Sequence, residues 1–380
     1  MQYKIWNWQQ QDWPHFTYET RLFEGAESKF LLNAGLSFGI SKHISDEENR
    51  DIIVSLISNE AYKTSEIEGE LLDRDSLQSS IKQHFGYQEK TSYNHPKENG
   101  IAEMMIDLHH HFDKSLSHDI LYSWHLMLMN GRRDLNAVGR YRIHEEPMQV
   151  VSGYIHKRKI HFEAPASKAM ESEMTAFIDW FNATSPTGVQ PLPALTRASI
   201  AHLYFVSIHP FEDGNGRIGR ALVEKILAQH LGQPTLIALS QVIQDRKKHY
   251  YDALEKQNKH NAIDEWINYF SDVLLQAQAY TLKEMEFLIK KTRFFDRFKN
   301  KMNARQQKVI TRMFAEGTKG FAGGLSAKNY MTIANTTAST ATRDLQNLVK
   351  LRALRKTGER KSTRYYLSEI SKYAGTGTQF

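Results

Sequence analysis

The chain has 380 residues, of which 41% are hydrophobic and 24% are charged. This composition excludes collagen-like, low-complexity and wholly disordered proteins, and the length favours two or three domains. The sequence contains no cysteine, which excludes disulfides, cysteine-ligated zinc, iron–sulfur clusters and thiol nucleophiles. Because no apolar run could span a bilayer and residues 1–16 lack the apolar region of a signal peptide, we expect a soluble, cytoplasmic protein without membrane contact.

The charge is unevenly distributed along the chain. The net charge is +6, yet residues 294–380 alone hold 17 basic and 5 acidic side chains. A basic module on a mildly acidic body indicates a partner with negative charge, and nucleic acid is the first candidate. A solvated basic surface without a partner is the alternative.

The N-terminal half is predicted to be helical. Trp6, Trp8 and Trp13 are expected to pack as an anchor against the body. A helical pattern then runs from about Asp46 to Glu68, with Ser45 as its N-cap. A second helix is followed by a loop over residues 86–100, where Gly, Asn and Pro cluster. Further helical patterns cover 101–112, 117–130 and 167–182.

An isolated hairpin interrupts the helices. Residues 148–151 and 159–162 flank a turn region that opens with Ser152–Gly153, and this pattern predicts two short strands. Helices then resume at about 193–208 and continue to about Glu286.

The C-terminal part has a different organisation. A charged connector is expected over 290–300, followed by helices at 304–316, 326–332 and 338–351 and a hairpin over 354–367. Three helices and a hairpin are typical of a winged helix. We therefore predict a mainly α fold with 1–98 as an N-terminal helical region, 99–290 as a core and 294–380 as a winged helix-turn-helix domain.

Residues 209–220, HPFEDGNGRIGR, carry the densest cluster of reactive side chains. Pro210 breaks the preceding helix and holds His209 at its end. Gly214 to Gly216 form a turn whose backbone N–H groups lie at the start of the next helix, which makes an anion site by geometry and dipole. The glycine spacing also fits a dinucleotide-binding fingerprint, but a helix and His-Pro precede it instead of a strand, so we discount that reading.

Three charged side chains complete this predicted site. Arg217 and Arg220 are three residues apart on one helix face and can bind phosphate oxygens. Asp213 is placed to hold Mg²⁺ against the same phosphates. With His209 as a base, the set suits the transfer of part of a nucleotide.

The segment 209–220 resembles the Fic/Doc family motif, HPFx[D/E]GN[G/K]RxxR, and fills every defined position. The resemblance extends over residues 1 to about 290. It implies an all-helical core with a β-hairpin flap before the motif, where the hairpin at about 147–163 is predicted. It also implies AMPylation, the transfer of AMP from ATP with Mg²⁺ or Mn²⁺ to a Ser, Thr or Tyr hydroxyl of a target protein, which could be the enzyme itself.

The resemblance assigns a role to each motif residue. His209 is implied to be the general base for the target hydroxyl, and Asp213 the metal ligand. The phosphate-binding residues are Gly214, Asn215 and Gly216 around the α- and β-phosphates, and Arg217 and Arg220 at the outer phosphates. Family members that phosphorylate their targets have Lys at the position of Gly216, which argues against that chemistry here. Tyr250 and Tyr251 lie where relatives line the adenine side, with core packing as the alternative.

Residues 64–69, Thr-Ser-Glu-Ile-Glu-Gly, fit the inhibitory signature of the same family, [S/T]xxxE[G/N]. Thr64 and Glu68 also continue the apolar stripe of their helix, so the Glu68 carboxylate is expected to point inward and to need a partner. The resemblance supplies Arg220 as that partner, which would make Glu68 an autoinhibitory residue within one polypeptide. The alternative is a surface glutamate near a helix end that Gly69 terminates.

The C-terminal module carries its own partner prediction. In the helix over 338–351, Thr340, Arg343, Asn347 and Lys350 lie opposite the apolar stripe, and such residues contact phosphates and base edges. With a basic wing over 355–364, we predict that 338–364 bind duplex DNA, and protein docking is the alternative.

Several alternatives stay open at this stage. A DNA-binding transcriptional regulator whose Fic core senses a nucleotide is the rival function. UMP or another group could replace AMP, because the motif reads phosphates and not the base. In some relatives the inhibitory glutamate also serves deAMPylation, and relatives make a homodimer plausible.

Overall fold

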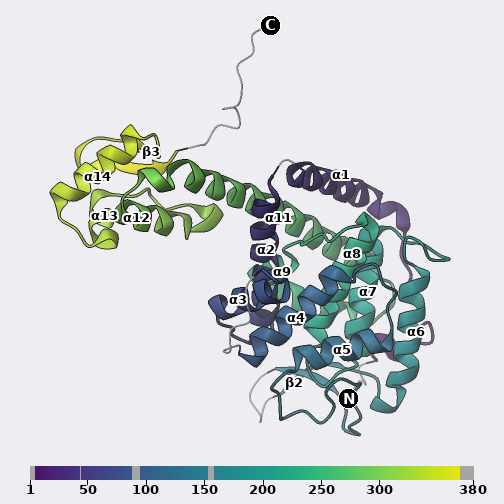
Figure 1. Ribbon diagram of the computed structural model, residues 1–380. Helices are drawn as coiled ribbons and strands as arrows, with labels where there is room; N and C mark the ends of the chain where they lie inside the picture. Colours follow the sequence, from purple (N-terminus) through teal and green to yellow (C-terminus); the bar gives the residue numbers. More distant parts are fainter. Residues whose placement is uncertain (1–4, 43, 88–94, 153–157, 369–380) are drawn as a thin grey trace. The chain divides into compact units, whose positions relative to one another are not determined.

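The computed structural model describes residues 5–42, 44–87, 95–152 and 158–368. It is mainly helical (Figure 1), as the sequence predicts. The chain forms two compact units, Met1–His43 with Asn49–Thr281, and Ile44–Glu48 with Leu282–Phe380. Two helices, α2 (Asp46–Ile67) and α11 (Asp264–Phe298), contribute residues to both units.

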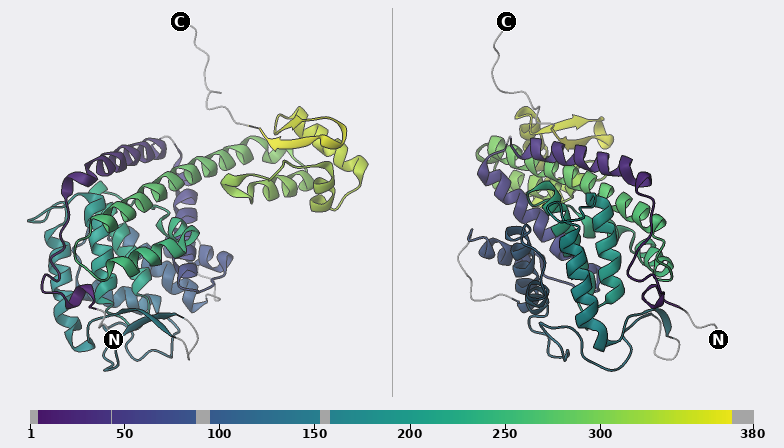
Figure 2. Two further views of the ribbon diagram at one scale, coloured as in Figure 1. Left: turned by 180° about the vertical axis from the view of Figure 1, so that it is seen from behind. Right: turned by 90° about the vertical axis from the view of Figure 1, so that its right-hand side faces the viewer.

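The first unit is a helical body around a central pair of helices. Its helices are α1 (Glu24–Ser41), most of α2 (Asp46–Ile67), α3 (Arg74–His84), α4 (Pro96–His110), α5 (His118–Leu128), α6 (Met170–Ala183), α7 (Ala194–Ile208), α8 (Asn215–Leu231), α9 (Leu239–Asp245), α10 (Lys247–Gln257) and the first part of α11. Helices α7 and α8 pack side by side (Figures 1 and 2). Every residue of α7 except Val206 is buried, so α7 is the rigid support of the segment that follows it.

Both ends of α7 are fixed by their neighbours. At its start, the Glu27 carboxylate of α1 accepts hydrogen bonds from the backbone N–H groups of Leu195 (3.0 Å) and Thr196 (2.8 Å). The first backbone N–H groups of a helix have no partner within the helix, so Glu27 satisfies them. Its negative charge also interacts favourably with the positive end of the helix dipole. At its end, His209 and Pro210 stop the helix.

The predicted hairpin is present before the motif. Strands β1 (Gln149–Ser152) and β2 (Lys159–Glu163) pair antiparallel, with an irregularity between Val150 and Val151; the expected turn residue Gly153 lies outside the described residues. Trp6 and Trp8 attach the N-terminal segment to this hairpin, whereas Trp13 packs against Tyr204 of α7 and donates to Glu173 of α6. Trp6 packs edge-on against Phe162, and the indole of Trp8 donates to the Glu163 carbonyl at 2.6 Å. We call β1 and β2 the flap.

Two predicted boundaries are wrong. The loop expected over 86–100 ends earlier, because α4 begins at Pro96, and proline suits the first position of a helix. The charged connector expected over 290–300 is mostly helical, since α11 continues to Phe298. Phe294 and Phe298, one turn apart on α11, are buried in the core of the second unit, and this burial sustains the helix despite its charged residues.

The second unit has the element order that the sequence predicts. It contains α12 (Ala304–Phe314), α13 (Ala327–Ala334), α14 (Ala338–Lys350) and the antiparallel strands β3 (Leu354–Thr357) and β4 (Arg364–Leu367). The buried carboxylate of Asp344 on α14 accepts hydrogen bonds from Asn303 (3.0 Å), Arg305 (2.9 Å) and Tyr330 (3.0 Å), which joins the three helices. The winged-helix class itself stays a prediction.

None of the helices in the described part of the chain combines the length and the apolar character that a membrane crossing requires.

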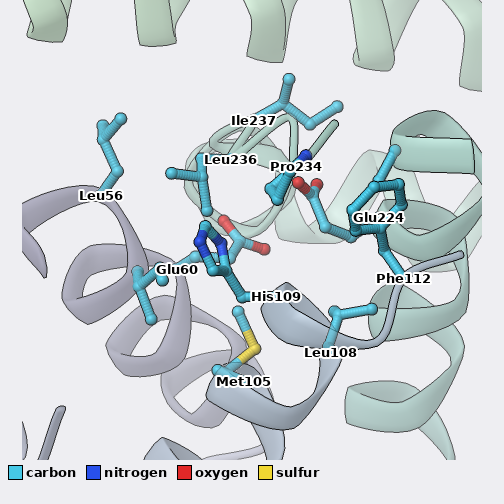
Figure 3. Close-up of a pocket in the computed structure, with 12 residues that line it drawn as sticks. Leu56, Glu60, Met105, Leu108, His109, Phe112, Glu224, Pro234, Leu236 and Ile237 are labelled. Carbon is cyan, nitrogen blue, oxygen red and sulfur yellow. The ribbon is translucent and has the colours of Figure 1, made fainter. Parts of the chain in front are cut away.

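A small cavity of about 20 Å³ lies between α2, α4 and α8 in the first unit. Figure 3 shows the side chains of Glu60, Glu224 and His109 around it, among apolar neighbours. Glu60 is held by Ser240, whose backbone N–H donates to the carboxylate at 3.0 Å. Burial nevertheless dominates and raises the pKa of Glu60 to about 8. Helix α2 is therefore docked through a carboxyl group that is protonated at neutral pH.

This buried carboxyl should make stability pH-dependent. Because the folded protein holds a proton on Glu60 that the unfolded chain loses above pH about 4.5, the free energy of unfolding should fall as pH rises from 4.5 through 8. Glu60→Gln, which cannot ionise, should show a smaller drop in Tm between pH 5 and pH 9 than the wild type in thermal melts. The exposed Glu145→Gln variant is the control and should match the wild type; equal slopes for Glu60→Gln and wild type would contradict the assignment.

Candidate active site

The predicted site lies where α7 ends and α8 begins. His209 caps α7 in the left-handed conformation, with φ 53°, and Gly214 (φ 84°) is the N-cap of α8. The loop between them is closed by Asn215, whose side chain accepts from the backbone N–H of Phe211 at 2.9 Å and donates to its carbonyl at 2.7 Å. The Asn215 side chain thus shapes the loop, and its backbone N–H, with the others in the first turn of α8, is what an anion would meet.

His209 has the protonation state of a base. Its Nδ1 lies 3.3 Å from the Val206 carbonyl oxygen, so Nδ1 carries the proton and Nε2 keeps the lone pair. Burial is the main cause that lowers the pKa of His209 to about 4, and the nearby charge of Arg142 acts in the same direction. At neutral pH the ring is therefore uncharged and able to accept a proton.

Arg142 holds the end of α7 and was not found from the sequence. Its side chain is 1% exposed and donates to the His209 carbonyl at 2.9 Å and to the Ser167 hydroxyl at 2.8 Å, while its backbone N–H donates to the Pro210 carbonyl at 2.9 Å. It also donates to the Pro165 carbonyl. The Arg142 guanidinium thereby connects the backbone of His209 to residues 165–167, which follow strand β2 of the flap.

Asp213 is ionised and already paired. Its Oδ1 accepts from the Gly214 N–H at 2.6 Å, and its Oδ2 accepts from the Nη1 of Arg132 at 2.6 Å. Burial alone would raise the pKa of Asp213, but Arg217, Arg132 and the Gly214 N–H together lower it below its usual value. Arg132, in the loop after α5, is a further site residue that the sequence did not reveal.

The donor set fits Mg²⁺ that arrives with a nucleotide. Mg²⁺ binds proteins through one or two carboxylates and completes its shell with phosphate oxygens and water. Asp213 offers one carboxylate beside the anion site, and the described residues contain no cluster of three His, Asp or Glu side chains that would hold a metal by themselves.

The two motif arginines are both paired with carboxylates. Arg220, 3% exposed, donates from Nη2 to Glu68 Oε1 at 2.7 Å and to the Thr64 carbonyl at 3.0 Å, and from Nε to the Thr64 hydroxyl at 2.7 Å. Arg217 forms an ion pair with Glu70. Glu68 and Glu70 lie on either side of Gly69, where α2 has ended and the backbone turns with φ 81°.

Gly216 allows this approach. A Cβ at Gly216 would lie 2.2 Å from Glu68 Oε1 and 3.1 Å from Arg220 Nη1. A side chain at 216 would therefore displace the Glu68 carboxylate from its present position.

The two tyrosines have different surroundings. Tyr250 is 2% exposed, and its hydroxyl and the Nε2 of the buried His202 form a hydrogen bond of 2.7 Å; this matches the packing alternative for Tyr250. Tyr251 is 37% exposed, with its ring 5.2 Å from that of Tyr250. Of the two side chains, Tyr251 is the one available to a ligand, and adenine binding stays a prediction.

Comparison with known proteins identifies the region that contains the site. Residues 115–227 match the model described as "Fic/DOC family". The chain contains a Fic domain. Residues 6–87, which include Thr64, Glu68 and Gly69, match a second model described as "Domain of unknown function (DUF4172)". The predicted resemblance to the Fic/Doc family is confirmed for residues 115–227.

Curated relatives of the Fic domain are named as adenylyltransferases. "Protein adenylyltransferase Fic" from Nematostella vectensis is 27% identical over 200 residues, covering 52% of this chain and 42% of that protein. "Protein adenylyltransferase fic-1" from Caenorhabditis elegans is 28% identical over 112 residues, covering 29% of this chain and 20% of that protein. The chain thus spans less than half the length of these relatives.

Solved structures support the fold. A Fic family protein from Desulfovibrio desulfuricans G20 has a TM-score of 0.52 at 19% identity, covering 95% of this chain and 99% of that chain. A Fic domain-containing signaling protein from Bacteroides thetaiotaomicron has a TM-score of 0.51 at 17% identity, covering 69% and 97%. The predicted Fic-type helical core is therefore confirmed at the level of the fold.

The Arg142 contact can be tested on the base itself. Arg142→Gln removes a positive charge beside His209 and should raise the pKa of His209, whereas Arg142→Lys keeps the charge and should leave the pKa nearer to the wild-type value. The measurement is a pH titration by NMR with isotope-labelled histidine, in which the His209 signal is identified by its loss in His209→Ala. An unchanged pKa in a folded Arg142→Gln variant would contradict this electrostatic link.

Proposed function

We propose that this protein is a protein adenylyltransferase that moves AMP from ATP to a Ser, Thr or Tyr hydroxyl of a target protein. The observation that carries the proposal is the position of His209 at the end of α7, directly before the N-terminus of α8, where Asp213 and Arg217 lie 3.5 Å apart and Arg220 follows one turn later. The names of the curated relatives support the reaction class. ATP, the target and the cytoplasmic location belong to the proposal, and the homodimer stays a prediction.

The proposed reaction follows from the positions of these groups. The target hydroxyl oxygen attacks the α-phosphorus, and its proton passes to Nε2 of His209. The bond between the α-phosphorus and the oxygen that leads to the β-phosphate breaks, and pyrophosphate leaves. Backbone N–H groups at the start of α8 stabilise the charge on the phosphates. Mg²⁺ or Mn²⁺, held by Asp213, would neutralise phosphate charge when bound.

Autoinhibition by α2 is the second part of the proposal. Phosphate oxygens and the Glu68 carboxylate compete for the same buried Nη2 of Arg220, so a nucleotide cannot take its productive pose while the ion pair of 2.7 Å exists. Breaking a buried pair of this kind can change the free energy by about 3–5 kcal/mol. Removing Glu68 should therefore raise the active fraction on the order of a hundredfold or more.

Labelling with α-³²P-ATP and Mg²⁺ tests both parts together. Glu68→Gly should label itself or a lysate protein on the order of a hundredfold more than wild type, and the Glu68→Gly His209→Ala double variant should not label at all. Gel autoradiography gives the readout. Equal labelling by wild type and Glu68→Gly would contradict autoinhibition, and label that persists without His209 would contradict the assigned base.

The same site could also catalyse the reverse process, removal of AMP from a modified target protein. In that reaction Glu68 would orient the attacking water. Release of AMP from a pre-labelled target by wild type, and not by Glu68→Gly, would assign that direction. UTP and GTP in the labelling assay distinguish AMP transfer from transfer of another nucleotide.

A DNA-binding regulator with a nucleotide-sensing Fic core is the second candidate function. One observation favours it: Arg343, Asn347 and Lys350 are exposed on one side of α14, and the basic residues Arg355 and Lys356 of β3 are exposed as well. Such a surface suits duplex DNA, through phosphate contacts from the hairpin and base-edge contacts from the helix.

Duplex binding is tested by fluorescence anisotropy at several salt concentrations. The Arg343→Ala Lys350→Ala variant should weaken binding about tenfold or more, because each phosphate contact adds to the salt-dependent affinity. Lys308→Ala, an exposed change on α12, is the matched control. Wild-type binding that is absent or insensitive to salt would count against this candidate.

A further inference from the structure

The end of α2 presents two carboxylates to the two motif arginines. Glu68 pairs with Arg220, and Glu70, two residues later, pairs with Arg217. Gly69 between them turns the backbone with φ 81°, and the N–H of Glu70 donates to the Ser65 carbonyl at 3.0 Å. The same turn that ends α2 therefore fixes both glutamates.

Arg217 has little left with which to bind a phosphate. Its side chain is 3% exposed. Its Nη1 bonds Glu70, and its Nη2 lies 3.5 Å from Asp213 Oδ1. Its buried Nε has no hydrogen-bond partner among the residues that the structure describes. A phosphate that binds Nη1 of Arg217 must therefore displace the Glu70 carboxylate, just as one that binds Nη2 of Arg220 must displace Glu68.

Glu70 is also held from the other side. Lys97, near the start of α4, places its Nζ 3.5 Å from Glu70 Oε1. A few residues further along the chain, the backbone N–H of Asp73 donates to the Glu98 carboxylate at 2.8 Å. The segment after α2 is thus tied to α4, and the Glu70 side chain is only 18% exposed. None of these contacts involves Glu68, so Glu70 is held on Arg217 by other neighbours.

We propose that Glu70 is a second inhibitory carboxylate, which keeps Arg217 from the nucleotide phosphates independently of Glu68. The inference rests on the proposed function, because it concerns the same phosphate site. Two carboxylates on two arginines mean that a triphosphate has to break two ion pairs, so removing Glu68 alone leaves the site partly closed.

Inorganic tripolyphosphate with Mg²⁺ is the probe, since it tests the phosphate site without depending on the base or on catalysis. Isothermal titration calorimetry should give tighter binding for Glu68→Gly than for wild type, and a further gain of about tenfold for Glu68→Gly Glu70→Gln. Glu66→Gln is the matched control: Glu66 lies on the same turn of α2 and pairs with Lys63 at 2.7 Å, and combining it with Glu68→Gly should add nothing. Thermal melts verify that each variant is folded.

The two proposals fail in different ways. If folded Glu68→Gly Glu70→Gln binds tripolyphosphate no better than Glu68→Gly, or binds it less well, Glu70 is not an inhibitor and the inference is overturned. If the double variant gains affinity but transfers no AMP from ATP, the second inhibitory role of Glu70 stands and adenylyl transfer is wrong. Restoration of weak binding by Glu68→Gly Glu70→Asp would support the need for a carboxylate at this position.

Discussion

Arg220 is a permanent positive charge in the protein interior, and the arrangement of the whole site depends on how that charge is matched. A guanidinium does not lose its proton under ordinary conditions. When it is buried, the fold is therefore strongly destabilised unless a negatively charged group pairs with it. Thr64 and Glu68 supply the partner in this structure, and the bound phosphates of a substrate would supply it otherwise. The buried guanidinium is thus paired with residues of its own chain.

Two carboxyl groups attach helix α2 to the rest of the first unit. Glu68, at the end of the helix, pairs with Arg220, and Glu60, two turns earlier, accepts a hydrogen bond from Ser240. Burial makes the ionised form of Glu60 unfavourable, so this second contact depends on pH. Under the proposed function the first contact would depend on bound phosphate, and the same helix would then be sensitive to both conditions.

The motif and the inward-facing Glu68 could be predicted from the sequence because both are local patterns, whereas the pairing of Glu68 with Arg220, 152 residues away, came from the family resemblance. The residues from His209 to Arg220 are contiguous, and the spacing of Thr64 and Glu68 follows one helix face. Arg132 and Arg142 were missed for the opposite reason: their partners lie 81 and 67 residues away, and a lone arginine has no spacing that would mark it. Pairings at this separation are decided by how α5, the flap and α7 pack.

The error in α11 has a different origin. The charged residues near 290–300 suggested a connector, whereas Phe294 and Phe298 were the informative residues because they fill the core of the second unit. The role of Asn215 was also only partly accessible. The family motif places it at the anion site, and the structure adds that its side chain is engaged in closing the loop around Phe211.

Gly216 leaves room on α8 for a side chain that comes from a distant part of the sequence. A Cβ there would lie 2.2 Å from Glu68 Oε1, so even an alanine at 216 would push this carboxylate away from its present place. Because the carboxylate is the far end of a flexible side chain, it could move without a change in either backbone. The close approach of α2 to the first turn of α8 is thus set by the volume of a single methyl group.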